Sequence, residues 1–146
     1  MRRLTLLAAV VVLAGCGGGS HRLSAKDYRA KATRICVDAK RQTDALGRPD
    51  TTRQFKVFIT KGIVVIDRNV RRFAALKPPA DLQRDHDAIV ASQRRGLDQF
   101  RRLATKLHGD SRDVALLRAV QPALKRISDE SDARFRAAGL DQCAQS

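Results

Sequence analysis

The sequence contains few aromatic residues and almost no glutamate. Of its 146 residues, 4% are aromatic, with one Tyr and no Trp, and Glu130 is the single glutamate. So few aromatic side chains argue against a surface on which single-stranded nucleic acid would stack. A single glutamate also excludes a Glu-x-x-His metal site of the kind found in helical bundles, because no His follows Glu130.

The sequence also lacks the local motifs of common enzymes. It has no Ser/His/Asp order, no glycine-rich phosphate loop and no metal-ligand spacing. Asp85, His86 and Asp87 form a polar cluster, but consecutive side chains on a helix diverge by about 100° and cannot converge on one ion. We therefore expect no enzyme and no cofactor, with His86 as a partly buried, hydrogen-bonded side chain.

The longest apolar run lies near the start of the chain and is too short to cross a membrane. Arg2 and Arg3 precede a nearly unbroken apolar stretch, Leu4–Leu13, which would span only about 15–18 Å as a helix. The hydrocarbon core of a bilayer is about 30 Å thick. This pattern predicts an export signal over residues 1–15, with general secretion favoured over twin-arginine export.

A lipid-attachment motif follows the apolar run directly. Leu13-Ala14-Gly15-Cys16 resembles the L-A-G-C lipobox of bacterial lipoproteins. The resemblance implies that Cys16 is lipidated and begins the mature chain, anchored on the extracytoplasmic face of the cell membrane by two acyl chains. Residues 16–23 would then be the lipidated cysteine and a flexible tether. The alternative is an ordinary signal peptide in which Cys16 is incidental.

The other two cysteines, Cys36 and Cys143, form an even pair in a chain expected in an oxidising compartment. We expect a disulfide between them, the alternatives being two buried free thiols or a two-cysteine metal site. Cys36 lies about 18 Å from the start of the first predicted helix. The fourth helix must therefore end beside the middle of the first, or the tail must double back along it.

The remaining chain, residues 24–146, has the periodicity of four helices. We expect these at about 24–46, 51–77, 79–107 and 110–139. Ser24 and Thr51 are predicted N-caps, Pro78 and Pro79 stop the second helix, and Gly139 ends the fourth with a left-handed cap. Pro122 should kink or split the fourth helix. The sequence predicts an all-α, up-and-down four-helix bundle, in which Val114 of the fourth helix faces the core.

The whole chain resembles the small helical lipoproteins of unknown function found in GC-rich Gram-positive (actinobacterial) genomes. The shared features are the lipobox, Cys36 in the first helix, the Leu76-Lys77-Pro78-Pro79 break and the closing Gly139-Leu140-Asp141-Gln142-Cys143. This resemblance implies a location and a fold, and it carries no activity.

Positive charge is the remaining functional signal. Lys and Arg number 29 against 15 acidic residues, a net charge of +14, and loss of Arg2 and Arg3 with the signal leaves +12. Paired arginines one heptad apart form a candidate basic surface patch on the third helix: Arg94, Arg95, Arg101 and Arg102. Anionic lipid, wall polymers or an acidic envelope protein are the expected partners, and nucleic acid is not. The alternative is a generally solvated surface.

Together these features predict a membrane-anchored, non-enzymatic lipoprotein that binds a component of the envelope. The alternative is a carrier of a small ligand, such as a metal, haem or an apolar molecule. Its pocket would lie between the helices near His86, Gly96 and the Pro122 kink, where packing should be loosest.

Overall fold

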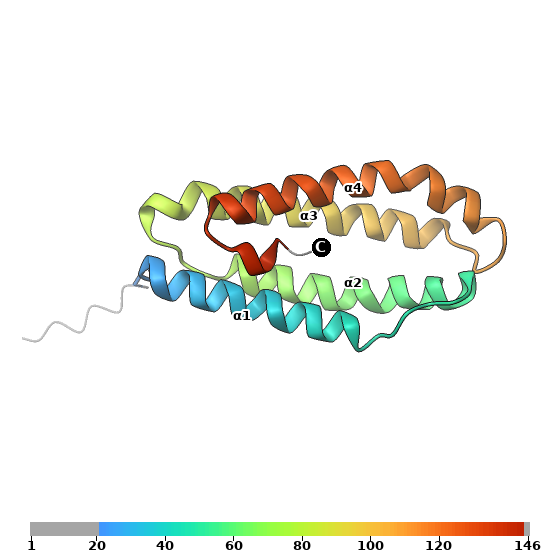
Figure 1. Ribbon diagram of the computed structural model, residues 1–146, viewed down its shortest axis with the longest axis horizontal. Coiled ribbons are helices and arrows are strands. Elements are labelled where there is room, and N and C mark those ends of the chain that lie inside the picture. Colours follow the sequence, from blue (N-terminus) through green and yellow to red (C-terminus); the bar gives the residue numbers. More distant parts are fainter. Residues whose placement is uncertain (1–20, 145–146) are drawn as a thin grey trace, which may run out of the picture.

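The computed structural model describes residues 21–144, which form four helices in an up-and-down bundle (Figure 1). The helices are α1 Ala25–Asp44, α2 Thr52–Ala74, α3 Gln83–Lys106 and α4 Asp113–Ala137, with 3-10 turns η1 at Ala80–Leu82 and η2 at Asp141–Cys143. No strand occurs in this part of the chain. The predicted all-α bundle closed by one disulfide is confirmed.

The two predicted N-caps start their helices. The Ser24 hydroxyl accepts the backbone N–H of Asp27 at 3.1 Å and donates to the Asp27 carboxylate at 2.7 Å. Thr51 and Gln54 form a complete capping box, in which each side chain accepts the backbone N–H of the other residue. These bonds satisfy N–H groups that have no partner within the helix, so they set where α1 and α2 begin.

The starts of α3 and α4 differ from the prediction. After Pro79 the chain first makes η1, and α3 begins only at Gln83. α4 begins at Asp113, because the carboxylate of this buried residue accepts the backbone N–H groups of His108 and Gly109 at 2.9 and 2.6 Å. These two hydrogen bonds hold residues 108–112 in a turn, so these residues do not add to the start of α4.

Pro122 does not split α4, which runs continuously through it. A proline inside a helix removes one N–H, so the carbonyl of Arg118, four residues earlier, loses its usual donor. Pro122 lies on the exposed face of α4, where neighbouring helices do not crowd its ring. Of the two outcomes predicted for this proline, a kink or a split, the split is absent.

Figure 1 shows α1 and α2 in one layer and α3 and α4 in the other, with the chain end between α1 and α4. Each helix packs against the next along the chain, and η2 contacts both α1 and α4. We call the end where α1 begins the tether end and the opposite end the distal end. The edge between α1 and α4 is filled at the tether end by the tail after α4, rather than by helix-to-helix packing.

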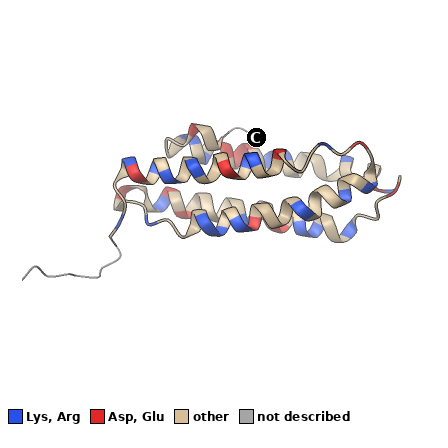
Figure 2. Cartoon of the chain, turned by 90° about the horizontal axis from the view of Figure 1, so that it is seen from below, with Lys and Arg blue, Asp and Glu red and all other residues tan. Residues whose placement is uncertain are grey.

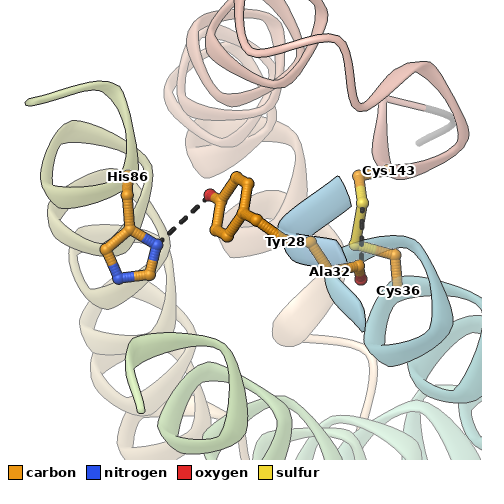
Figure 3. Close-up of a disulfide and its surroundings, with 5 residues drawn as sticks. All are labelled: Tyr28, Ala32, Cys36, His86 and Cys143. Atoms are coloured by element: carbon orange, nitrogen blue, oxygen red, sulfur yellow. Dashed lines mark hydrogen bonds between the residues drawn. A yellow bond between two sulfur atoms is a disulfide. The ribbon is translucent and has the colours of Figure 1, made fainter. Parts of the chain in front are cut away.

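The Cys36–Cys143 disulfide holds this tail, with the two Cα atoms 5.2 Å apart (Figure 3). Gly139 adopts the left-handed conformation (φ 70°) predicted for it and turns the chain at the end of α4, beside Arg29. Leu140 is buried at this turn, and the tail then runs back along α1 to Cys36. Of the two arrangements that the sequence allowed, the tail that doubles back is the one observed.

The best-packed part of the core lies behind this tail, at the tether end. Eleven buried residues form it, among them Tyr28, Phe73, Ile89, Phe135 and Leu140. The Phe73 ring packs edge-on against both Tyr28 and Phe135. Burial of these large side chains is worth about 1.5–3 kcal/mol each, so this cluster is the main source of stability.

Each pair of helices that are consecutive in the chain is joined by one ion pair between a carboxylate of one helix and an arginine of the other. Asp38 of α1 binds Arg72 of α2 at 3.2 Å, and Asp67 of α2 binds Arg101 of α3 at 2.9 Å. Glu130 of α4 binds Arg95 of α3 at 2.7 Å. Each exposed pair contributes little stability on its own, about 0.2–1 kcal/mol, but the three together favour this order of helices.

The folded domain begins slightly before its predicted boundary at residue 24. The backbone N–H of Leu23 donates to the carbonyl of Lys77 at 2.8 Å. Arg22 donates to the carbonyl of Pro78 and to the side chain of Gln83. The last residues of the expected tether are therefore part of the bundle. Within the described residues, no helix is long and apolar enough to cross a membrane.

We expect loss of the disulfide to destabilise the domain strongly. The bond closes a loop of 107 residues, and the chain-entropy model assigns such a loop about 4–5 kcal/mol. The double variant Cys36→Ser/Cys143→Ser should lose free energy of unfolding of this order in urea titrations under oxidising conditions. Wild-type protein measured with a reductant should match the variant. Equal stability of oxidised wild type and variant would contradict this role.

Candidate functional site

An open apolar groove lies at the distal end, between α2 and α4 with α3 as its floor. We call it the distal groove, and its volume is about 760 Å³. Its apolar lining consists of Phe55, Ile59, Phe100, Leu103, Val114, Leu117, Val120 and Leu124. Such a lining, with a few polar groups at its rim, is typical of binding sites.

The distal half of the core is incompletely covered. Only Ile59, Leu103 and Leu107 of its cluster are buried, while nine further apolar members are partly exposed. The tether-end cluster has the opposite balance, with eleven buried and six partly buried members. A stretch of apolar surface left open in this way, rather than scattered single side chains, marks a surface suited to a partner or ligand.

The groove is open because α1 is too short to cover it. The side chain of Leu46, just after α1, lies beside Gly62 in the middle of α2. Residues 52–61 of α2 therefore extend about 15 Å beyond α1. The connection after α1 crosses the other flank of α2, where Pro49 lies near Val57. It does not fill the space that a longer α1 would occupy.

One lip of the groove is a regular face of α4. Val114, Leu117, Gln121 and Leu124 follow each other at steps of three and four along this lip. The sequence predicted Val114 as an inward position, but 41% of the residue is exposed. The helical period of α4 is as predicted. At the distal end, however, no helix of the described residues lies opposite its inward face, because α1 stops short of it.

The groove and the hollow beside it carry basic side chains. Arg118 and Lys125 lie on the α4 lip; Lys125 binds Asp129 at 2.7 Å, and no carboxylate within the described residues binds Arg118. Arg53 and Lys61 line the neighbouring hollow on α2, also without a carboxylate partner among residues 21–144. The surplus of positive charge at the groove itself therefore lies on the α4 lip, and Arg53 and Lys61 add positive charge on the other flank of α2.

The structure divides the predicted arginine patch into two kinds of side chain. Arg95 binds Glu130 of α4, and Arg101 binds Asp67 of α2, on the opposite flank of α3. Arg94 and Arg102 are exposed and have no carboxylate partner in the described part of the chain. Only these two are free for an external anion.

Charge elsewhere is spread over the whole bundle rather than concentrated near this patch. Figure 2 shows basic segments distributed along the helices, with acidic ones between them. Hydrogen bonding from Arg134, followed by the charge of Arg95, lowers the pKa of Glu130 and keeps it ionised. Glu130 is thus a structural counter-charge and not a candidate catalytic acid.

His86 lies in the core and fills the space that a ligand would need. Its Nδ1 is 3.2 Å from the Tyr28 hydroxyl (Figure 3). Its ring also stacks on Phe73, with the ring centroids 5.3 Å apart. Gly96, the other side of the predicted pocket, lies against Ile127. No three His, Cys, Asp or Glu side chains within residues 21–144 form a potential metal site. The open space on this side of the bundle is therefore the distal groove, and not a pocket beside His86 and Gly96.

Burial keeps the His86–Tyr28 pair uncharged. Burial lowers the pKa of His86, against the opposing influence of Asp87 and a hydrogen bond with the backbone of Ala74. Burial, followed by the charge of Asp85, raises the pKa of Tyr28 to about 12. A neutral imidazole has one donor and one acceptor nitrogen, so when the other ring nitrogen donates to the backbone of Ala74, Nδ1 accepts from the protonated Tyr28 hydroxyl. This pair stabilises the core and has no exposed reactive atom.

Sequence analysis missed the distal groove, although one signal for it was present. The Gly47-Arg48-Pro49 break ends the first helix early, while the next three helices are longer. Comparing those lengths would have shown that one helix cannot reach the distal end. The apolar period of a single helix does not indicate how long that helix is relative to its neighbours.

We expect acid to destabilise the domain through His86. Its pKa is lower in the folded chain than its ordinary value of 6.5, so the unfolded chain binds more protons as the pH falls. The stabilising contribution is complete above pH 6.5 and declines as the pH falls toward the folded-state pKa. Between about pH 7.5 and pH 5, His86→Gln should lose less free energy of unfolding than wild type. His108→Gln, an exposed control, should behave like wild type; equal pH dependence in all three proteins would contradict the prediction.

Within the arginine patch, we expect the two unpaired arginines, Arg94 and Arg102, to contribute most of the attraction to an anionic membrane. A basic residue near such a surface is worth about 1 kcal/mol, so Arg94→Gln/Arg102→Gln should weaken vesicle binding by up to about 30-fold at low salt. Arg95→Gln/Arg101→Gln is the matched control, because neighbouring helices hold these side chains. Co-sedimentation across a salt series measures the effect. Equal losses in the two variants would contradict this division of the patch.

Comparisons with known proteins assign no role to these features of the chain. No protein-family model, curated protein or solved structure matches it. The distal groove and its basic rim, together with the lipobox pattern, therefore carry the functional argument.

Proposed function

We propose that the protein is a membrane-anchored extracytoplasmic lipoprotein that acts as a non-enzymatic binding module of the cell envelope. The observation that carries the proposal is the distal groove, an apolar binding surface at the end of the bundle opposite the tether. The lipobox at Leu13–Cys16 supports the anchor, although Cys16 lies outside the described residues. The Cys36–Cys143 disulfide fits an oxidising compartment.

The position of the tether relative to the groove suits a binding module. The chain enters the bundle at Leu23, which is bonded to Lys77 at the tether end. A lipid on Cys16 would keep that end close to the membrane. α2, with 23 residues, spans about 35 Å, so the groove would be presented well away from the bilayer. A surface in that position is accessible to other envelope components.

A second candidate function, the carrier of a small apolar molecule, is supported by the volume of the groove. About 760 Å³ lies within the range of about 300–1,000 Å³ that ligand pockets occupy. Such a ligand would rest on Phe55, Phe100 and Leu117 rather than near His86. Native mass spectrometry of the purified protein distinguishes the two candidates, because a carrier should retain a bound apolar molecule.

We expect Cys16→Ser to abolish membrane anchoring. Without the thiol no acyl chains can be attached, so the protein should leave the membrane fraction or accumulate as an uncleaved precursor. Fractionation, intact mass and labelling with palmitate measure this, with the wild-type protein as the labelled control. A variant that stays membrane-bound at high salt after removal of residues 1–15 would contradict the lipoprotein assignment.

A further inference from the structure

We propose that the distal groove docks an acidic amphipathic helix of a second envelope protein. This inference rests on the proposed function and specifies the partner of that binding surface. It follows from three observations: the shape of the open space, the spacing of the apolar positions along it and the charge around it.

The open space has the position and length of a missing helix segment. In the tether half, α1 packs beside α2, whereas in the distal half residues 52–61 of α2 have no such neighbour. The opposite lip, from Val114 to Ser128 on α4, runs for about 21 Å. A helix of about three turns, matching the distance of about 15 Å by which α1 falls short, would continue the line of α1 here and complete the four-helix arrangement.

The lining favours a helix over a small molecule. Apolar side chains recur on α4 at the steps of three and four that mesh with a facing helix. The groove is open along one side, whereas pockets for small molecules bury most of the ligand surface. A helix with apolar residues at i, i+3, i+4 and i+7 would cover Phe55, Leu117 and Leu124 while its other face stays in water.

The charge of the rim selects an acidic partner. Arg118 on the α4 lip has no carboxylate partner among the described residues, and Lys125 on the same lip is paired with Asp129, so the lining of the groove carries a net positive charge. Asp or Glu on the flanks of the docked helix would meet these cations. A second copy of this chain is a poor occupant, because two domains of +12 repel each other.

Site-specific photocrosslinking of the full-length protein in its own envelope tests the proposal. A photoreactive benzophenone side chain is placed at position 114, which lines the groove, and at position 64 as a control. Val64 is the matched site, since it is also an exposed valine (57%) and does not line the distal groove. The crosslinked segment is then identified by mass spectrometry of the adduct.

The expected result is an adduct specific to position 114 on a segment of another protein with helical apolar periodicity and an excess of Asp and Glu. Arg118→Gln should reduce its yield about two- to fivefold, as loss of one exposed ion pair predicts. Arg84→Gln, an exposed arginine at the tether end, should leave the yield unchanged. Leu124→Asp should reduce the yield about tenfold or more, with circular dichroism as the check that the domain is folded.

Other outcomes would overturn the proposal. An adduct to lipid would assign the groove to the membrane surface, and an adduct to a second copy would assign it to self-association. Equal adducts at positions 114 and 64, no adduct at 114, or a yield insensitive to Arg118→Gln would each exclude the acidic helix. Because anchoring is measured separately through Cys16, failure of the docking proposal is distinguishable from failure of the lipoprotein proposal.

Discussion

The covalent link between Cys36 and Cys143 determines how the edge between α1 and α4 is built. The first and last helices of an up-and-down bundle usually pack against each other, which closes the core on all sides. Here the tail after α4 lies between them, turned back at Gly139 and held to the middle of α1. Behind it the buried Tyr28, Phe73 and other large side chains pack without exposure. The stability of the tether half therefore depends on a segment that is not part of any of the four helices.

The same arrangement leaves the distal half open. The described part of the tail is held at Cys36, and α1 ends at Asp44, so neither of these segments covers the distal ends of α2 and α4. Apolar side chains there keep the helical spacing of a core but lack a partner on one side. A protein that exposes such a surface loses part of the hydrophobic stabilisation that burial would provide. Retaining it at the end far from the tether is consistent with a role in binding.

Charge has two separate roles in this domain. Asp38, Asp67 and Glu130 each join an arginine of a neighbouring helix, so scarce carboxylates lie at helix interfaces. The surplus of basic residues is left at the surface, including Arg118 beside the groove. An arginine count from the sequence does not separate these roles. Only the position of each guanidinium relative to a carboxylate on another helix does so.

The sequence by itself determined the helical class, the pairing of the two cysteines and the ends of several elements. These follow from local chemistry: the period of apolar residues, the caps at Ser24 and Thr51, and the freedom of Gly139 to adopt a left-handed conformation. It also predicted that a disulfide would constrain the tail, since a chain of fixed bond lengths can bring Cys143 to Cys36 in few ways.

Tertiary structure alone decided the distal groove, the exposure of Val114 and the division of the arginine patch. Each depends on which segments lie opposite one another, and a helical period gives the inward face of a helix without showing what faces it. Val114 has an inward position and is nevertheless exposed, because α1 stops short of it. Arg95 and Arg94 are adjacent in sequence, yet only Arg95 has a carboxylate within reach on the next helix. The physical reason is that exposure and charge pairing are set by distances between helices, which single-helix patterns do not encode.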